Sequence, residues 1–295
     1  METRIFSLLF LSLLLQSSHG RSGSSSSGSF DPTRVIHLSW NPRIFLYKGF
    51  LSHKECDHLI NLAKDKMQRS LVVDDETGQS MESTVRTSSG MFLKKSQDDV
   101  VSTIENRIGA WTFLPSENGE NLQILHYEYG QQYEPHFDVL PDEVDADFGG
   151  HRTATVLMYL SDVAAGGETV FPDSPMKHRQ LKGDDWSDCA KQGFAVKPSK
   201  GDALLFFSLH PNGTTDPMSL HGSCPVIKGD KWSATKWIHI RSYNLRAKTA
   251  GDKCVDENES CAGWAAAGEC EKNPVYMVGS EDSLGYCRKS CKACS

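Results

Sequence analysis

The sequence lacks an excess of positive charge, because 38 Asp and Glu residues outnumber 31 Lys and Arg residues and give a formal net charge of −7. Proteins that bind the phosphate backbone of nucleic acids present a basic surface, so no nucleic-acid partner is expected. The sequence also lacks a long internal repeat, and beyond residue 20 no apolar run is long enough to span a membrane. The 295 residues suit one domain of roughly 200 residues with smaller appendages.

The first 20 residues have the pattern of a secretory signal. Arg4 provides the positive start, Ile5–Leu15 is an apolar run interrupted only by serine, and Ser18–Gly20 offers small residues for cleavage. The run is about half of the ~20 residues that a membrane-spanning helix needs, which favours cleavage. Retention of residues 1–20 as the signal anchor of a single-pass type II membrane protein is the alternative. Residues 21–33 are rich in Gly and Ser and read as a flexible linker.

Cysteine content also indicates the secretory pathway. Nine cysteines is a high count for a reducing compartment, and six of them lie between Cys254 and Cys294. Asn212 and Asn258 each begin a glycosylation sequon. We therefore expect the protein in the endoplasmic reticulum or the Golgi, with its main domain in the lumen.

Two helices are predicted in the first half of the chain. Ser52 and Glu55 form a capping-box pattern ahead of apolar residues at helical spacing, which continue to Met67. A second apolar series with the same spacing follows Ser96 and ends at Trp111.

Short strands are predicted after the helices. Apolar or alternating runs bounded by Gly, Pro and Asp indicate strands at Asn121–Glu128, Thr153–Leu160, Ala203–Leu209 and Trp237–Tyr243. Helices followed by many strands predict an α+β domain over residues 34–246. In this domain the helices would cover one sheet of a double-stranded β architecture.

A His-x-Asp pair is the strongest candidate for a metal site. Positions i and i+2 of a strand point to the same side, so His136 and Asp138 can hold one ion. His126 and Glu128 have the same spacing and form the rival pair. His126 continues an apolar face, however, whereas His136 follows Pro135 at the mouth of a strand. We therefore prefer His136 and Asp138.

The third ligand is expected from a returning strand, on which His210, His221 and His239 are candidates. Of these, only His221 has a basic residue ten positions on, namely Lys231. Two imidazoles and one carboxylate can occupy one face of an Fe(II) octahedron and leave three positions for an oxidisable cosubstrate and O2. A lysine supplies a point charge for a dicarboxylic cosubstrate. Two adjacent strands joined by a turn at Lys228–Asp230 would return Lys231 to the metal.

The set of His136, Asp138, His221 and Lys231 resembles the prolyl 4-hydroxylases, specifically the single-chain type of plants and algae. The resemblance extends from Val35 to Arg246. Further stretches that match this family are Arg86–Gly90 (RTSSG), Tyr127–His136, Arg152–Leu160 (RTATVLMYL), Gly166–Thr169 and Pro198–Phe207 (PSKGDALLFF).

The resemblance implies a fold, cofactors and a reaction. The fold would be a distorted double-stranded β-helix, or jelly roll, with supporting helices. Fe(II) would bind to His136, Asp138 and His221, with 2-oxoglutarate and O2 as cosubstrates and L-ascorbate to restore oxidised iron. Lys231 would pair with the distal carboxylate of 2-oxoglutarate, with Thr235 as a further partner. The reaction would be 4-hydroxylation of peptidyl proline, with release of succinate and CO2.

The resemblance also places residues around the substrate. Tyr127 would lie near the cosubstrate or in the pocket wall, and Tyr133 would lie near the substrate proline. Arg152 and Trp237 would bind the peptide and close around the proline. Arg86–Gly90, which is polar and ends in glycine, would be a mobile loop that closes over the peptide.

Proline-rich peptides are the expected substrates. They adopt the polyproline II conformation, which aromatic-lined grooves receive at low entropic cost, and several tyrosines precede His136. The plant-type resemblance implies clients of the extensin and arabinogalactan type. Hydroxylation of lysine or of a small molecule is the first alternative. A peptide-binding module without catalytic activity is the second.

Residues 254–294 are predicted to form a separate, cysteine-rich module. A segment this short with few large apolar side chains cannot build an adequate core and needs covalent staples. Six cysteines allow fifteen pairings, and spacing alone does not choose among them. The ending Cys287-x3-Cys291-x2-Cys294 resembles the ShKT module, a resemblance that implies the pairs Cys254–Cys294, Cys261–Cys287 and Cys270–Cys291.

Metal binding by this module is disfavoured, because no histidine follows residue 239 and the expected compartment is oxidising. A substrate or partner contact and a passive appendage are both open as its role. Outside the module, Cys189 and Cys224 could pair near the metal site. Cys56 lies on the first predicted helix and is expected to be a buried thiol.

Overall fold

The computed structural model describes residues 30–70, 72–73, 80–81, 84–139, 149–243, 254–279 and 284–294. The expected signal or anchor at residues 1–20 and most of the expected linker at 21–33 lie outside these residues. Within the described ranges, no helix is both long enough and apolar enough to cross a bilayer.

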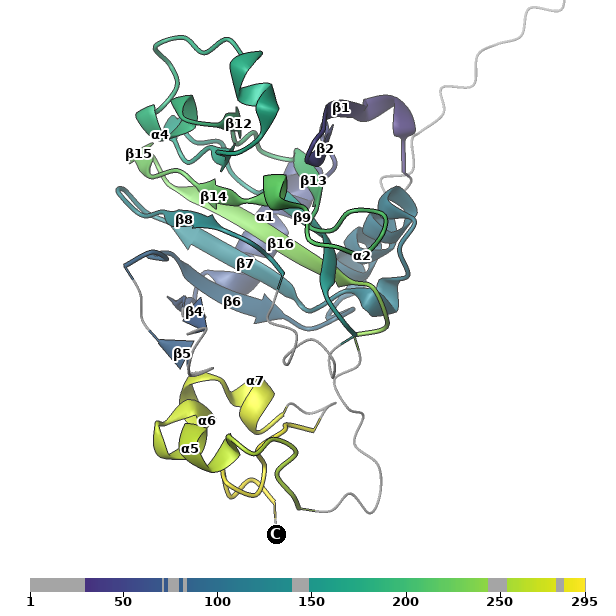
Figure 1. The fold of residues 1–295 in the computed structure, drawn as a ribbon, viewed down its shortest axis with the longest axis vertical. Coiled ribbons are helices and arrows are strands. Elements are labelled where there is room, and N and C mark those ends of the chain that lie inside the picture. Colours follow the sequence, from purple (N-terminus) through teal and green to yellow (C-terminus); the bar gives the residue numbers. More distant parts are fainter. Residues whose placement is uncertain are drawn as a thin grey trace, which may run out of the picture.

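The larger of the two main sheets has eight strands and runs through the centre of the molecule (Figure 1). Neighbouring strands pair antiparallel throughout this sheet. In spatial order the strands are β1 (Val35–Trp40), β2 (Arg43–Tyr47), β13 (Ala203–Phe207), β9 (Arg152–Tyr159), β16 (Lys231–His239), β7 (Leu122–Tyr127), β6 (Ser89–Leu93) and β3 (Gln68–Arg69).

Two helices pack on one face of the large sheet. Helix α1 (His53–Ala63) begins with the predicted capping box of Ser52 and Glu55 but ends before Met67. Helix α2 (Asp99–Thr112) is capped by Asp98, whose side chain accepts a hydrogen bond from a backbone N–H of the first turn. The second helix therefore starts later than the predicted position after Ser96, because Asp is as good a cap and lies directly before the helix.

The main hydrophobic core lies between these helices and the sheet. Both helices contribute their apolar faces, and the sheet contributes the alternate side chains that point toward them. Its largest fully buried members are Tyr47, Leu51, Leu59, Leu93, Ile104, Leu122 and Ile124.

The smaller sheet faces the other side of the large sheet. Its four antiparallel strands are β12 (Phe194–Val196), β11 (Thr169–Phe171), β14 (His221–Ser223) and β8 (Tyr133–His136). A second core cluster joins the two sheets, with Tyr159 and Phe206 of the large sheet packed against Phe171 and Phe194 of the small one. Two facing antiparallel sheets with flanking helices are the double-stranded β-helix architecture that was predicted, so the fold class is confirmed.

Short elements complete the main domain. Two two-stranded sheets are formed by β10 (Ala165–Gly166) with β15 (Val226–Lys228), and by β4 (Val72–Val73) with β5 (Ser80–Met81). Among the described residues of this domain, the remaining short helices are η1 (Pro32–Arg34), η2 (Ser116–Asn118), η3 (Pro175–His178), α4 (Asp188–Lys191) and η4 (Pro217–Ser219).

Two segments differ from the sequence prediction. The last predicted strand was Trp237–Tyr243, whereas β16 begins at Lys231 and ends at His239. In the first half of β16, every second residue is polar and lines the pocket. This half of the strand therefore lacks the apolar pattern of a buried strand. Arg86–Gly90 was predicted as a loop, but β6 already begins at Ser89, because Gly90 pairs with Leu125 of β7.

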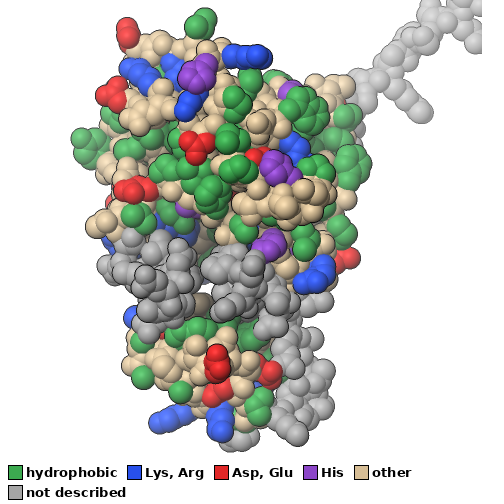
Figure 2. Space-filling model, viewed as in Figure 1, with side chains coloured by type: hydrophobic (Ala, Val, Ile, Leu, Met, Phe, Trp, Pro, Cys, Tyr) green, Lys and Arg blue, Asp and Glu red, His purple; other side chains and the backbone are tan. Residues whose placement is uncertain are grey.

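The cysteine-rich segment forms a small unit at one end of the molecule (Figure 1). It contains α5 (Cys261–Ala266), α6 (Glu269–Lys272) and α7 (Pro274–Met277). Its core is small and is built around Met277, Tyr286 and the bonded pair Cys261–Cys287. Figure 2 shows charged side chains of both signs on the visible face of this module.

The cysteine pairs of the structure are the ones that the ShKT resemblance implies. Disulfides join Cys254 to Cys294, Cys261 to Cys287 and Cys270 to Cys291. A further disulfide joins Cys189 of α4 to Cys224, directly after β14. Cys56 is a buried free thiol.

Candidate functional site

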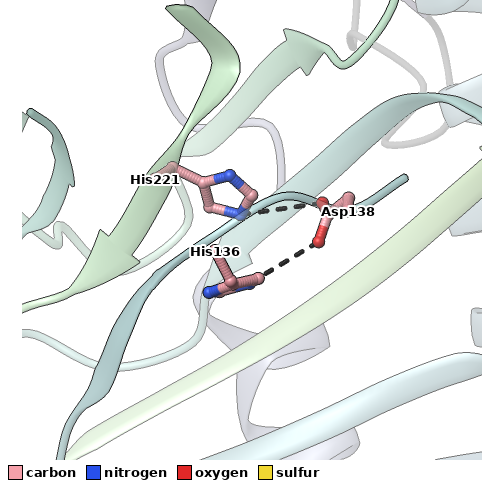
Figure 3. Close-up of side chains that lie close together, drawn as sticks. All are labelled: His136, Asp138 and His221. Carbon is pink, nitrogen blue, oxygen red and sulfur yellow. Dashed lines mark ion pairs between the residues drawn. The ribbon is translucent and has the colours of Figure 1, made fainter. Parts of the chain in front are cut away.

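Two paired strands of the small sheet bring the predicted metal ligands together. His136 ends β8 and His221 begins β14, and these two residues are direct partners in the antiparallel ladder. Asp138 lies two residues after His136. Its two carboxylate oxygens each lie 3.6 Å from a ring nitrogen, Oδ1 from His136 Nε2 and Oδ2 from His221 Nε2. Figure 3 shows the three side chains pointing toward one another.

Backbone carbonyls set the tautomer of both histidines. Nδ1 of His136 lies 2.8 Å from the carbonyl oxygen of Glu134, and Nδ1 of His221 lies 3.0 Å from that of Ser219. A carbonyl oxygen can only accept, so each Nδ1 must donate its proton. Each Nε2 then keeps a bare lone pair toward the centre of the triad, which is the state that binds a metal.

The charge state of the triad also suits a divalent metal. Burial lowers the pKa of His221 to about 4, although the neighbouring Asp138 opposes this shift. Burial alone would raise the pKa of Asp138, but the rings of His221 and His136, when protonated at low pH, outweigh it and hold that pKa well below its usual range. At neutral pH the site therefore offers a carboxylate and a neutral buried imidazole.

The donor set fits Fe(II). One oxygen and two nitrogen donors, whose ligand atoms lie within 4.8 Å of one another, match the two-histidine, one-carboxylate face of non-haem iron oxygenases. Thr155 supplies an outer hydrogen bond, since its Oγ1 donates to Asp138 Oδ2 at 2.6 Å. A bond of this kind orients a ligating carboxylate.

The rival histidines are engaged elsewhere. His126 lies on the helix-facing side of the large sheet, stacked on Trp232 at 4.0 Å with Nε2 2.9 Å from Asp230. His239 is fully buried and its Nε2 lies 2.9 Å from a carboxylate oxygen of Glu120. His210 lies 3.8 Å from Asp216. The structure brings none of these three into the triad.

Lys231 reaches the triad from the opposite sheet. The sequence suggested that adjacent strands would return it, but β14 belongs to the small sheet, whereas Lys231 begins β16 of the large one. Its side chain is 1% exposed, and Nζ donates to Ser223 Oγ at 2.8 Å. Burial lowers the pKa of Lys231 to about 7, and Glu168 opposes this shift.

A pocket with an empty volume of about 450 Å³ contains both the triad and the lysine. Large-sheet strands supply one wall and small-sheet strands the other. The lining residues are Arg86, Leu125, Tyr127, Tyr133, His136, Asp138, Thr155, Leu157, Thr169, Phe206, His221, Gly222, Ser223, Lys231, Ser233, Thr235 and Trp237.

Four residues placed at the pocket by resemblance do line it. Lys231 Nζ lies 5.2 Å from the ring centroid of Tyr127, so this tyrosine lies at the lysine end. Tyr133 stacks on His136 with ring centroids 3.6 Å apart, so it lies at the metal end. Thr235 and Trp237 follow on β16, two and four residues after Ser233, and share its face.

Arg152 lies behind the pocket wall and not among the lining residues. Its guanidinium forms a two-pronged contact with Glu120, at 2.5 Å from Nε and 3.1 Å from a terminal nitrogen. The guanidinium carbon also lies 4.1 Å from the ring centroid of Trp237. Arg152 therefore contacts a lining residue, and its contact with the peptide stays a prediction of the resemblance.

Several pocket residues were not singled out from the sequence. Arg86 was treated as part of a loop, yet it is buried, it donates to Gln123 at 3.0 Å and it lies 4.7 Å from the ring of Tyr133. Ser223 and Ser233 line the pocket beside Lys231. A period of two counted outward from His221 and from Lys231 would have found both serines.

Some donors in the pocket have no hydrogen-bond partner among the residues that the structure describes. These buried atoms are Arg86 Nε, Ser233 Oγ and Trp237 Nε1. Buried polar atoms are rarely left unpaired in native proteins, so these atoms make the pocket suited to binding a polar molecule.

Comparisons with known proteins agree with this site. Residues 122–239 match the 2OG-Fe(II) oxygenase superfamily. The chain is 61% identical over 316 residues to Probable prolyl 4-hydroxylase 7 of Arabidopsis thaliana, and the match covers 100% of both chains. It is 65% identical over 295 residues to Probable prolyl 4-hydroxylase 6 of the same plant, again over 100% of both.

A solved structure is also similar. The crystal structure of the viral collagen prolyl hydroxylase of Paramecium Bursaria Chlorella virus-1, as its 2OG complex, is 26% identical, with a TM-score of 0.49. The match covers 66% of this chain and 94% of the viral one.

Proposed function

Because the chain belongs to the prolyl 4-hydroxylase family of Fe(II)- and 2-oxoglutarate-dependent oxygenases, we propose that it hydroxylates proline residues of peptides at C4. It is a 2-oxoglutarate-dependent dioxygenase that uses Fe(II) and consumes 2-oxoglutarate and O2, with release of succinate and CO2. The observation that carries the proposal is that two histidines, one aspartate and a buried lysine meet in a single pocket.

In this proposal His136, Asp138 and His221 hold the iron. Fe(II) bound with 2-oxoglutarate supplies O2 activation, coupled to decarboxylation of the cosubstrate. The protein's own part is orientation and exclusion of water. Its triad is formed by two paired strands and one hydrogen bond from Thr155, so little reorganisation is needed on binding.

Lys231 is proposed to seat the distal carboxylate of 2-oxoglutarate. Its ammonium lies in a largely desolvated end of the pocket, where a charge-assisted contact is stronger than in water. Ser223 of β14, which accepts the hydrogen bond of Lys231, and Thr235 of β16 offer hydroxyls to the same carboxylate. Ser233 lies between Lys231 and Thr235 on β16, and its unpartnered Oγ is a further donor.

Tyr133 and Trp237 are proposed to receive the substrate proline. An aromatic wall suits the flat, rigid ring of proline and the polyproline II conformation of its neighbours. Proline-rich cell-wall glycoproteins of the extensin and arabinogalactan type are the proposed clients. We also propose that ascorbate restores iron that has been oxidised in unproductive cycles.

The endoplasmic reticulum or the Golgi is the proposed location, with the enzyme in the lumen. Four disulfides and the sequons at Asn212 and Asn258 support this proposal. Asn212 is exposed and therefore accessible to glycosylation. Residues 1–20 would direct the protein into the secretory pathway, either as a cleaved signal or as a retained anchor.

Mass spectrometry of peptide products tests the proposed function. The purified protein is incubated with Fe(II), 2-oxoglutarate and ascorbate, and with a proline-rich peptide, a lysine-rich peptide or no peptide. We expect a gain of one oxygen on proline and peptide-dependent succinate release. Oxygen on lysine instead, or turnover that no peptide stimulates, would refute the proposal and favour one of the other oxygenase activities.

Matched variants separate catalysis from peptide binding alone. Asp138→Ala should abolish turnover and iron retention, whereas Glu128→Ala changes the carboxylate of the rival pair and should leave both unchanged. Proline-rich peptide bound by the wild type without any turnover would instead identify a binding module.

A further inference from the structure

The C-terminal module contacts the main domain through Tyr243. The ring of this residue packs against the core of the module, which includes Met277 and Tyr286. Its backbone belongs to the main domain, because its N–H donates to Glu117 O at 2.9 Å and its carbonyl accepts from Lys95 Nζ at 3.0 Å. Tyr243 therefore joins the two parts of the molecule.

The other side of Tyr243 faces the end of β16. Its ring stacks on His239, with ring centroids 4.8 Å apart and planes inclined by 26°. His239 is fully buried, and its two ring nitrogens contact the carbonyl of Gly150 and the carboxylate of Glu120. Both ring nitrogens of His239 are thus engaged, and the Tyr243 ring packs on one face of the imidazole.

Glu120 links His239 to the wall of the pocket. It lies 2.9 Å from His239 and is bonded twice to Arg152, whose guanidinium lies over Trp237. Trp237 lines the pocket together with His136 and Asp138. A continuous series of contacts therefore runs from the core of the C-terminal module to the wall proposed to receive the substrate.

We infer that the C-terminal module is a positioning element for peptide binding, which acts through Tyr243, His239, Glu120 and Arg152 on Trp237. The inference rests on the proposed function, and it assigns the module a role in the affinity for the peptide. When the module is docked, the Tyr243 ring holds the imidazole of His239 in place. The fixed imidazole in turn keeps Glu120 aligned with Arg152. Arg152 in turn fixes the plane of Trp237, whose Nε1 is buried with no partner among the described residues and whose side chain lines the pocket.

This arrangement predicts a selective kinetic effect. The iron ligands lie on β8 and β14 of the small sheet, and Lys231 lies eight residues before His239, at the other end of β16. A change at Tyr243 should therefore raise the KM for the peptide and leave iron binding and the KM for 2-oxoglutarate unchanged. General loss of structure would change all three.

The experiment uses the full chain with Tyr243→Ala, Tyr243→Phe and Trp40→Ala. Trp40 is 69% exposed on edge strand β1, so its variant controls for loss of an aromatic ring away from the pocket. For Tyr243→Ala we expect the KM and the Kd of a proline-rich peptide to rise roughly three- to tenfold, the effect of a lost aromatic pair. Tyr243→Phe keeps the ring and should raise the peptide KM much less than Tyr243→Ala, and Trp40→Ala should behave as the wild type.

A second variant guards against misfolding. Cys261→Ser with Cys287→Ser removes the disulfide in the core of the module without a change to the main domain, and it should raise the peptide KM in the same way. If Tyr243→Ala does not fold, Tyr243→Leu takes its place, because leucine keeps an apolar side chain against the core of the module and removes the ring stacking on His239.

An unchanged peptide KM in Tyr243→Ala and in the disulfide variant would overturn the inference, as would an equal rise in the KM for 2-oxoglutarate. Wild-type protein that adds no oxygen to proline would instead overturn the proposed function. The two failures are therefore distinguishable, because the first requires an active wild type.

Discussion

Two backbone carbonyls determine the chemistry of the metal ligands at the scale of single residues. They fix the protons of His136 and His221 on Nδ1, and Thr155 fixes the carboxylate of Asp138. The ligands are thus oriented before any metal binds. Outer hydrogen bonds raise the affinity for a metal by orienting its ligands in this way.

Thr155→Val tests this outer shell. Valine keeps the shape of threonine but cannot donate to Asp138, so the carboxylate gains freedom and the affinity for Fe(II) should fall about 10- to 100-fold. Thr155→Ser keeps the hydroxyl and should retain most of the affinity. Metal titration of both variants gives the comparison, and wild-type affinity in the valine variant would contradict the assigned role.

Lys231 should make cosubstrate binding depend on pH. Burial lowers its pKa to about 7, so the free site holds an ammonium below that pH and loses it as the pH rises. The KM for 2-oxoglutarate should therefore increase above pH 7, with a limiting slope of about tenfold per pH unit. A bound carboxylate favours the charged lysine and so raises its pKa in the complex, and the KM should therefore keep rising until the pH reaches that higher value.

Lys231→Arg is the control for this titration. Arginine stays protonated over the whole range, so the KM of the variant can be higher but should not vary with pH. The KM for 2-oxoglutarate is measured from pH 6 to 9 for both proteins. The same pH profile in the arginine variant would assign the titration to another group.

The pairing of β8 with β14 positions the site at the scale of elements. Gly222 follows His221 in β14, and a Cβ atom there would lie 2.9 Å from the carbonyl oxygen of Tyr133 and 3.1 Å from the nitrogen of Pro135. Glycine thus permits the two strands to approach. The distance between the histidines depends on this close approach.

Gly222→Ala should push these strands apart and separate His136 from His221. We expect a loss of ~1–3 kcal/mol in unfolding free energy, typical of overpacking, together with weaker iron binding. Gly263→Ala is the matched control, because an added Cβ at this position in α5 meets no atom within 4 Å. Chemical denaturation measures the unfolding free energy, and metal titration measures the affinity for iron. Wild-type iron affinity in Gly222→Ala would contradict the role of glycine at this position.

The two facing sheets combine residues from distant parts of the chain at the scale of the whole molecule. The small sheet supplies the metal ligands, and the large sheet supplies Lys231 and Trp237. The disulfide Cys189–Cys224 secures the end of β14 outside this pocket. Eight of the nine cysteines are bonded, which leaves Cys56 as the free thiol.

Alkylation tests this disulfide pattern. Burial raises the pKa of Cys56 to about 12, so its thiol should not react in the native protein. After unfolding without a reductant, mass spectrometry should find one alkylated cysteine, at position 56. Labelling of Cys189 or of any cysteine in residues 254–294 under these conditions would show that a disulfide is missing.

The amino-acid sequence by itself determined the ligand types and the period-two spacing of His136 and Asp138. It also determined the capping box at Ser52 and the apolar faces of both helices. These features are local, since each depends on residues within a few positions of one another. The resemblance of the longer stretches supplied the reaction and the cofactors, which spacing alone would not give.

Tertiary structure alone decided which strands face each other across the pocket. Lys231 lies opposite the triad because β16 belongs to the large sheet, and the sequence suggested a neighbouring strand instead. Arg152 lies behind Trp237 because Glu120 and His239 hold it there. Contacts of this kind join residues far apart in the chain, and no local pattern encodes which of them will meet.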